Sequence, residues 1–378
     1  MLNEKTDLMG LSGSHQRLIH LLRRSAPASR AELAALSGLT PAAVSMLIHE
    51  LMVRGIVVES GRRQGHRGPP QIDLRLSPDA GYALGIHADY YSVYLTLLDF
   101  CGTLRGEHQI RNSFATFDNV AATIAGGAEA LLSRTGISAA DLIGAGFALP
   151  IRFRSTEPAL DLAEDVGRWG GIDIATTLSD ALGCSVIVEN DANAAAIGEL
   201  TVGNPEHHKS FFHLYLGSGI GGAVVLNGNL YRGAIGNAGE IGALRPRSIC
   251  RPSFDDLAAW LKADGVVLPQ GRDPDEWETV LAAAPESVER WLQRAGPEAA
   301  RLAFAAGAIL DPPAIYIGGT LPKSVRRALI GWMDFSRPAL FDGATLGQPR
   351  ILLSEIPATN SAALGAAALV LHHMTSPP

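Results

Sequence analysis

The periodicity of the apolar residues changes near residue 80 and divides the chain into two parts. Before that point apolar residues recur roughly every three or four positions, as on amphipathic helices. From about residue 82, short apolar runs suited to strands alternate with helical stretches, which is typical of a layered α/β fold. With 378 residues the chain is long enough for two or three domains. The pattern predicts a small helical module followed by a larger α/β body.

The charges divide the chain at the same place. The formal net charge is −7, but residues 10–75 hold nine arginines against four acidic residues, which gives +5. Residues 1–9 add −1, which leaves −11 for residues 76–378. A basic module joined to an acidic body favours nucleic acid as a partner of the module alone.

Targeting and redox signals are weak. The N-terminal sequence lacks a basic segment followed by an apolar one, and no run of about 18 apolar residues occurs, so we expect a cytoplasmic protein without membrane contact. Cys101, Cys184 and Cys250 are far apart in the sequence and match neither a CxxC pair nor an even disulfide framework. We therefore expect reduced thiols.

Residues 14–51 carry the signals of three short helices. Residues 14–24 place apolar side chains on one helical stripe. Ser29 and Glu32 fit a capping box at the start of the second helix, and Gly38 suits its left-handed end. The third helix begins after Thr40, a good N-cap. Its expected core face consists of Val44, Leu47, Ile48 and Leu51.

Two short helices joined by a glycine turn, the second opening with small residues, are typical of a helix-turn-helix. Small residues let the helix backbone approach the floor of the major groove of DNA. An ordinary helical bundle is the alternative. If the module binds DNA, the side chains of the third helix that face the groove are Thr40, Ala42, Ser45, Met46 and His49.

The residues after the third helix favour a winged helix-turn-helix. Residues 55–59 are expected to form a strand, residues 61–70 a basic loop, and residues 72–76 the returning strand. Basic side chains on such a wing neutralise phosphates, and an arginine next to glycine can enter a minor groove. A solvated basic loop without a partner is the alternative. The wing residues expected to bind duplex operator DNA are Arg62, Arg63, His66 and Arg67.

Three segments of the body are similar, in order and spacing, to the ROK family of sugar kinases and sugar-responsive repressors. They are VENDANAAAIGE, LGSGIGGAVVLNGNLYRGAIGNAGEIG and LDPPAIYIGGT. The resemblance runs from about residue 82 to the end, and the winged helix-turn-helix ahead of it resembles the repressor branch.

The resemblance implies an α/β fold in which an N-terminal winged helix-turn-helix is followed by an actin-like two-lobed ROK domain. The ligand would lie in the cleft between the lobes. Residues 1–13 would form a flexible arm and residues 14–76 the DNA-binding domain. Lobe 1 would comprise residues 82–198 with 359–374, and lobe 2 residues 199–358.

The resemblance also assigns ligand-binding residues. In relatives, the residues matching Asn190 and Asp191 hydrogen-bond sugar hydroxyls, and in the kinases the aspartate is also the general base. Glu240 matches a glutamate of the sugar pocket, and Asp255 is a looser match to a second one. Each residue has an alternative role. Asn190 or Asp191 could cap the helix that follows, Glu240 could be a solvated loop carboxylate, and Asp255 could be an N-terminal helix charge.

One departure from the family concerns ATP. ROK kinases carry an Asp-x-Gly-Gly-Thr turn, whose glycines let backbone amides approach the phosphates. Here His87 stands where the aspartate belongs, and Asp89 and Tyr90 fill the two glycine positions of residues 85–91. An added carboxylate would repel phosphate and two side chains would obstruct its approach. We expect no kinase activity and no catalytic residues.

A second departure concerns zinc. In many relatives a Glu-x-Gly-His histidine joins three cysteines on a structural zinc ion. Here that histidine is Ala243, and Cys250 stands alone in the segment that follows. One cysteine cannot complete a tetrahedral site, so we expect neither a metal nor another cofactor. The lost histidine also removes one polar contact from the pocket.

These observations favour a transcriptional regulator, a repressor, whose body binds a sugar or a sugar derivative. Such a protein would form a homodimer or homotetramer, so that two recognition helices meet two half-sites. One alternative is an active sugar kinase with an appended DNA-binding domain. Another is a regulator whose pocket no longer senses sugar.

Overall fold

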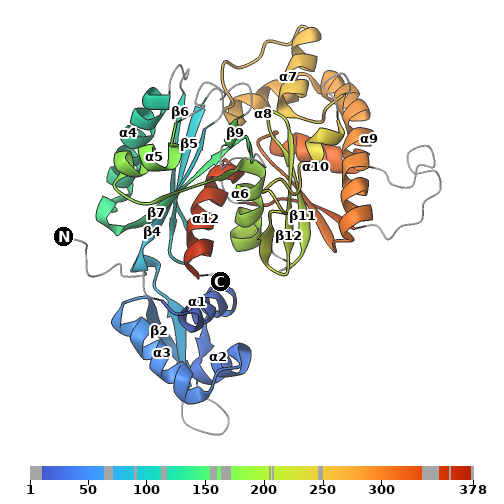
Figure 1. Ribbon diagram of the computed structural model, residues 1–378. Coiled ribbons are helices and arrows are strands. Elements are labelled where there is room, and N and C mark those ends of the chain that lie inside the picture. The colour runs from blue at the N-terminus through green and yellow to red at the C-terminus, as the bar shows by residue number, and fades with distance from the viewer. Residues whose placement is uncertain are drawn as a thin grey trace.

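The computed structural model describes residues 11–63, 71–88, 92–111, 117–153, 160–162, 172–203, 206, 208–245, 250–333, 349–356 and 359–375. A small N-terminal module lies at one end of a two-lobed body (Figure 1). The last helix of the chain ends beside this module.

The N-terminal module combines three helices with a three-stranded sheet. Its helices are α1 (Gly13–Ser25), α2 (Arg30–Ser37) and α3 (Pro41–Val53). The strand order is β1 (Ala28–Ser29), β3 (Gln71–Leu76) and β2 (Val57–Arg63), and both pairings are antiparallel. This is the predicted winged helix-turn-helix arrangement.

The predicted helix caps of the module are confirmed. Ser29 Oγ accepts from the Glu32 N–H at 3.3 Å, and Glu32 Oε2 accepts from the Ser29 N–H at 2.7 Å. Gly38 ends α2 with a φ of 71°, in the left-handed region that favours glycine. Thr40 Oγ1 accepts from the Ala43 N–H at 3.3 Å at the start of α3. These bonds fix both helices of the helix-turn-helix.

The predicted wing needs one correction. Residues 61–63 were expected in the loop, but β2 continues to Arg63, with Arg62 paired to Ile72 and Arg63 to Gln71. The register shifts between Glu59 and Gly61, and this irregularity lets the pairing continue beyond the predicted strand end. The base of the wing is therefore a ribbon of two strands.

Lobe 1 is built on a five-stranded sheet in the order β10-β7-β4-β5-β6. The strands are β4 (Tyr82–Ala88), β5 (Ser92–Asp99), β6 (Leu104–Arg111), β7 (Leu142–Leu149) and β10 (Val186–Asn190). Helices α4 (Phe117–Thr135) and α5 (Ile174–Leu182) cover its outer face. A separate hairpin joins β8 (Ile151–Phe153) and β9 (Leu160–Leu162), and short 3-10 turns lie at Pro78–Ala80 and Ala139–Asp141.

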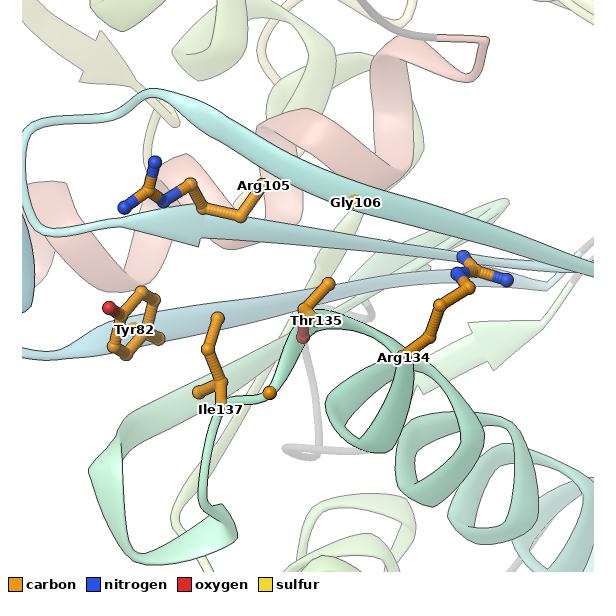
Figure 2. A pocket seen from close by; sticks show the side chains of 7 residues that line it. Tyr82, Arg105, Gly106, Arg134, Thr135 and Ile137 are labelled. Atoms are coloured by element: carbon orange, nitrogen blue, oxygen red, sulfur yellow. The ribbon is translucent and has the colours of Figure 1, made fainter.

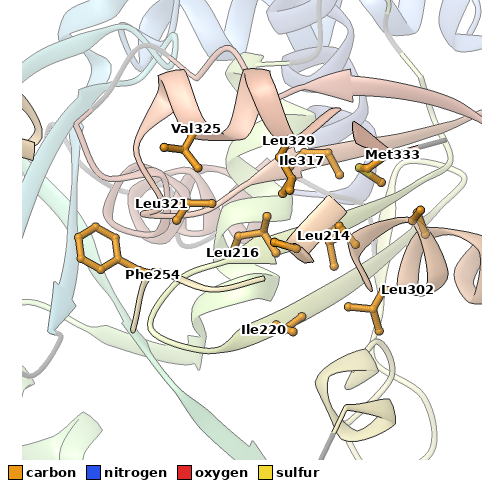
Figure 3. Close-up of a cluster of buried hydrophobic side chains, with 14 of the residues drawn as sticks. Leu214, Leu216, Ile220, Phe254, Leu302, Ile317, Leu321, Val325, Leu329 and Met333 are labelled. Atoms are coloured by element: carbon orange, nitrogen blue, oxygen red, sulfur yellow. The ribbon is translucent and has the colours of Figure 1, made fainter. Parts of the chain in front are cut away.

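Lobe 2 has a second five-stranded sheet in the order β13-β12-β11-β14-β15. The strands are β11 (Phe211–Leu216), β12 (Ile220–Leu226), β13 (Asn229–Tyr231), β14 (Ala314–Gly318) and β15 (Arg350–Leu353). The helices are α7 (Phe254–Ala263), α8 (Pro274–Ala283), α9 (Pro285–Leu310) and α10 (Lys323–Trp332). Figure 3 shows the core between this sheet and its helices, where Leu214, Ile317 and Leu329 are fully buried.

Two helices fill the space between the sheets. They are α6 (Asp191–Gly198), which continues into a π-helical turn (Glu199–Gly203), and α12 (Ser361–Thr375). Both are rich in alanine, which lets them pack closely. A Cβ at Gly365 of α12 would lie only 1.9 Å from the Ala194 carbonyl oxygen of α6, so the two backbones touch. This confirms the predicted fold class, a winged helix-turn-helix followed by an actin-like two-lobed domain.

No single helix among the residues described is long and apolar enough to span a bilayer; only α2 and α3 reach that length and composition jointly, across a bend of 115°.

Candidate ligand cleft and nucleic-acid interface

Asn190 ends β10 and caps α6. Its Oδ1 accepts from the backbone N–H groups of Ala192 and Asn193 at 2.9 and 3.1 Å. Its Nδ2 donates to the Ile151 carbonyl oxygen at 2.9 Å. The capping role that we considered as an alternative is therefore present. Contact between Asn190 and a ligand stays a prediction, and one amide hydrogen is left for it.

Asp191 is the first residue of α6, and its Oδ1 accepts from the Ala192 N–H at 2.9 Å. Burial, and to a smaller extent the charge of Glu240, raise the pKa of this carboxyl from 3.8 to about 7. The structure thus brings Asp191 close to Glu240 in space, although the two lie far apart in the sequence. Glu240 itself precedes a 3-10 turn (Ile241–Leu244).

Glu189 is a functional candidate that the sequence analysis missed. It is 3 % exposed, and its Oε2 accepts from Arg232 Nη2 at 2.7 Å and Arg232 Nε at 3.1 Å. Its Oε1 accepts from Asn193 Nδ2 at 3.0 Å and from the Asn190 N–H at 2.9 Å. Arg232 follows β13 of lobe 2, so this ion pair joins the two lobes beside Asn190. Glu189 stands in the first family motif, but nothing in the sequence indicated its partner.

Asp255 lies in the first turn of α7, after the N-cap Ser253. Its Oδ1 forms an ion pair with Arg272 Nη2 at 2.5 Å, and the Asp255 side chain is 59 % exposed. The guanidinium of Arg272 stacks on Phe254 at 4.4 Å from the ring centroid. This is the helix-terminal position of our alternative interpretation, and a ligand contact by Asp255 stays a prediction.

His87, which the family resemblance places at a phosphate-turn aspartate, is a buried structural residue. It is 3 % exposed, and its Nδ1 lies 3.0 Å from Asn360 Nδ2. Its ring stacks on Tyr94 at 6.1 Å between centroids. Asn360 Oδ1 accepts from the Ala363 N–H at 2.9 Å, so His87 fastens β4 to the start of α12. Asp89, Tyr90 and Tyr91 lie outside the described residues.

The segment that carries zinc in relatives is attached to the rest of lobe 2 by side chains. Arg245 forms an ion pair with Glu298 of α9 at 2.7 Å, with 12 % and 14 % of the side chains exposed. Cys250 Sγ lies 3.8 Å from Asp256 Oδ2, and burial together with Asp256 raises the pKa of this thiol to about 12. No group of three or more His, Cys, Asp or Glu residues could hold a metal ion in the part of the chain that is described. The absence of zinc stays a prediction.

A surface pocket on lobe 1 lies apart from these residues (Figure 2). Its two guanidinium groups, of Arg105 and Arg134, point to opposite ends of the pocket. Both are engaged, because Arg105 Nε lies 3.5 Å from Asp99 Oδ2 and Arg134 donates to the Glu107 carbonyl. None of the expected ligand residues contributes to its lining, which is Tyr82, Arg105, Gly106, Arg134, Thr135, Gly136 and Ile137.

The outer face of α3 is the candidate nucleic-acid interface. The helix buries its predicted core residues and exposes all five side chains expected to face DNA, Thr40, Ala42, Ser45, Met46 and His49. Met46 is 58 % exposed. Arg62 is exposed on β2. The Arg63 side chain, His66 and Arg67 lie outside the described residues.

Comparisons with known proteins give one family and several relatives. The model of the ROK family matches residues 92–255. An uncharacterised protein of Sinorhizobium fredii, y4fQ, is 30 % identical over 321 residues, which covers 85 % of this chain and 81 % of that protein. The xylose repressor of Bacillus spizizenii is 30 % identical over 229 residues, 60 % of this chain and 58 % of the repressor.

Solved structures share the fold. The crystal structure of a ROK family transcriptional regulator, described as a homologue of the E. coli MLC protein, aligns with a TM-score of 0.69. The identity is 18 %, and the alignment covers 99 % of this chain and 97 % of that one. A ROK family glucokinase from Streptomyces griseus, in complex with glucose and AMPPNP, aligns with a TM-score of 0.61 at 18 % identity. The alignment with the glucokinase covers 76 % of this chain and 99 % of the glucokinase chain. The alignment with the regulator, in contrast, extends over nearly all of this chain.

Proposed function

This chain belongs to the ROK family, and we propose that it is a DNA-binding transcriptional repressor controlled by a sugar or sugar derivative. The observation that carries the proposal is the N-terminal module. Its α3 exposes a row of small side chains next to a two-stranded ribbon that bears Arg62. This geometry fits a helix in the major groove with a wing on the flanking phosphates. The similarity to xylose repressors supports the same function.

The acidic residues at the start of α6 support a ligand rich in hydroxyl groups. Asp191 and Glu240 place two carboxylates near each other at the start of α6. A carboxylate accepts strong hydrogen bonds from hydroxyl donors, and a sugar supplies several of them on adjacent carbons. Binding would change the equilibrium between arrangements of the two lobes only if the ligand has different affinities for them.

The DNA-binding proposal is tested by selecting sites from a random duplex library and measuring affinity by fluorescence anisotropy. Replacing Arg62, Arg63 and Arg67 together by alanine should weaken binding strongly. It should also reduce the slope of log affinity against log salt by about 2–3, because each phosphate contact contributes about 0.9. Arg301→Ala, an exposed arginine of α9, is the matched control. Unchanged affinity in the triple variant would contradict the role of the wing.

The alternative of an active sugar kinase makes the opposite prediction. We expect no sugar-dependent release of ADP from ATP and Mg²⁺, because His87 is buried against Asn360 where relatives carry the phosphate-turn aspartate. A coupled ADP assay with a panel of hexoses, pentoses and amino sugars measures this. Turnover that disappears in Asp191→Asn would establish the kinase instead.

The alternative of a pocket that senses no sugar is tested by thermal shift. A ligand that binds the folded state raises the melting temperature as its concentration increases. We expect stabilisation by at least one sugar or sugar derivative, and no stabilisation by the same compound in Asp191→Ala. If no compound in the panel acts, the sensing role fails while the DNA-binding role stands. Light scattering on the same samples tests the proposed homodimer or homotetramer.

A further inference from the structure

The hydrophobic core of the N-terminal module continues into lobe 1. Leu18 and Leu22 of α1 belong to the same buried cluster as Phe100, which follows β5, and Leu371 of α12. Figure 1 shows α1 lying against the end of α12, and the two helices are in contact. The module is thus held on the body by this shared core as well as by the connecting chain between Leu76 and Tyr82.

Arg23 of α1 forms the polar part of this junction. Its Nη2 donates to the Phe100 carbonyl at 2.9 Å and its Nη1 to the Leu371 carbonyl at 3.5 Å. The guanidinium also lies 5.4 Å from the centroid of the Phe100 ring. Leu371 is in the last turns of α12, where the helix dipole favours a cation. Burial lowers the pKa of Arg23 to about 10, so it stays charged at neutral pH.

The other end of α12 packs near the start of α6, where Ala362 and Ala192 belong to one buried cluster. Asn360, just before the helix, is hydrogen-bonded to His87 at the end of β4. Along its length α12 touches α6 at Gly365, as described above, and it touches lobe 1 at Gly85. A Cβ at Gly85 would lie 1.9 Å from the Ala363 carbonyl oxygen. Helix α6 itself begins with Asp191. Contacts between backbones cannot adapt by changing rotamers, so α6 and α12 must move together.

We propose that Arg23 is a positioning residue that fixes the DNA-binding module to α12, so that movement of the α6–α12 pair at the cleft is passed to α1. The inference rests on the proposed function, because only a DNA-binding module makes its position matter. It goes beyond that function by naming the route and the residue at its end. A coupling route of this kind requires a test by mutation.

The first test is calorimetry on the full chain, which needs neither DNA nor ligand. Wild-type protein should unfold with the module and lobe 1 in a single transition. In Arg23→Gln the module should melt separately and earlier, while the transition of the body stays and shows that the body is folded. Arg24→Gln, the neighbouring arginine on α1, is the matched control and should keep the single transition. Arg23→Lys keeps the charge but loses the two-pronged guanidinium that donates to both carbonyl groups. Its effect should lie between those of wild type and Arg23→Gln.

The second test uses DNA and a readout that loss of stability alone would not change. Selected half-sites are placed at a series of spacings in duplex oligonucleotides. Wild-type protein should prefer one spacing by about tenfold, within the range of coupling found between sites in proteins. Arg23→Gln should bind a single half-site as well as wild type does, yet lose the preference for spacing.

The outcomes separate the two proposals. If wild-type protein binds no DNA, the proposed function fails, and calorimetry alone decides whether Arg23 fixes the module. A single transition in Arg23→Gln together with an unchanged spacing preference would overturn the inference. An equal effect of Arg24→Gln would overturn it as well, because positive charge on α1 would then suffice.

Discussion

At the scale of single residues, two acidic side chains near the start of α6 have opposite environments. Glu189 is buried but accepts four hydrogen bonds, two of them from the Arg232 guanidinium. For Asp191 the largest influence is burial, which disfavours its charged form, and the nearby Glu240 acts in the same direction. Glu189 therefore joins the lobes, and we propose that Asp191 meets the ligand, whose hydroxyl groups would stabilise the ionised carboxylate.

The pKa of Asp191 leads to a prediction about stability and pH. Because its pKa rises from 3.8 to about 7 on folding, its contribution is fully present below 3.8 and is lost as the pH rises through 7. Between pH 5 and pH 8 the free energy of unfolding of wild type should fall as Asp191 ionises. Asp191→Asn cannot ionise and should not show this fall, which is on the order of 2 kcal/mol. Urea denaturation at both pH values measures this. A difference that does not change with pH would contradict the assignment.

A second residue-scale prediction concerns the segment where relatives bind zinc. Arg245→Ala leaves the half-buried Glu298, among the described residues, with only its 3.6 Å contact to Arg301, and should lower the free energy of unfolding by about 2–3 kcal/mol. Lys323→Ala, which breaks an exposed ion pair with Glu355, should cost less than about 1 kcal/mol.

Extensive dialysis against a chelator should leave the melting temperature of wild type unchanged. A fall after chelation would show that a metal ion stabilises the protein.

At the scale of elements, α12 is the part that the others share. It packs on β4, β5 and β7 of lobe 1, on α6, and on α1 of the module. Its glycine and alanine residues allow this, because they let neighbouring backbones come into contact. A helix that touches so many elements at short range can serve as a common reference for the lobes and the module.

The packing of α12 is tested with a pair of glycine substitutions. Gly365→Ala would place its Cβ 1.9 Å from the Ala194 carbonyl oxygen, and should destabilise the protein by about 1–3 kcal/mol or more. Gly126→Ala in α4 meets nothing within 4 Å, and should stabilise the protein by about 0.5–1 kcal/mol. Chemical denaturation of both variants gives the comparison. Equal effects at the two sites would show that α6 and α12 are not in close contact.

Elements with strong local signals could be predicted from the sequence, and contacts between distant segments could not. Capping residues and apolar spacing located α2 and α3. The sequence analysis did not predict β6, an edge strand whose LRGEHQIR sequence has several charged residues and a weak apolar alternation. Glu189, Arg23 and His87 have partners that lie 43, 348 and 273 residues away in the sequence. Periodicity and capping signals are local, so they cannot identify such partners. The capping role of Asn190 was recognisable, but the structure was needed to show it.

At the scale of the whole molecule, the junction between module and body gathers positive charge. His372 near the end of α12 is within the electrostatic influence of His20 and Arg23 of α1, of Arg232 after β13 and of the adjacent His373. Burial, and then these charges, lower the pKa of His372 from 6.5 to about 4. A neutral His372 is therefore part of the docked arrangement.

This charge pattern predicts that acid loosens the module. Because the folded pKa of His372 lies below 6.5, its contribution is present above pH 6.5 and is lost as the pH falls toward 4. The melting temperature of the wild-type protein should fall as the pH is lowered from 7.5 to 5. The fall should be smaller in His372→Gln. Calorimetry at a series of pH values measures the difference. Identical pH profiles for wild type and variant would exclude His372 as a source of the effect.

We propose that one molecule binds DNA with its module and releases it when a sugar binds at Asp191. The most direct measurement is fluorescence anisotropy of a selected operator with bound protein, titrated with the sugars and sugar derivatives that stabilise the protein in the thermal-shift screen. We expect a fall in anisotropy with at least one compound for wild type, and none for Asp191→Ala, which should still bind the operator. Binding to the operator that no stabilising compound alters would contradict it.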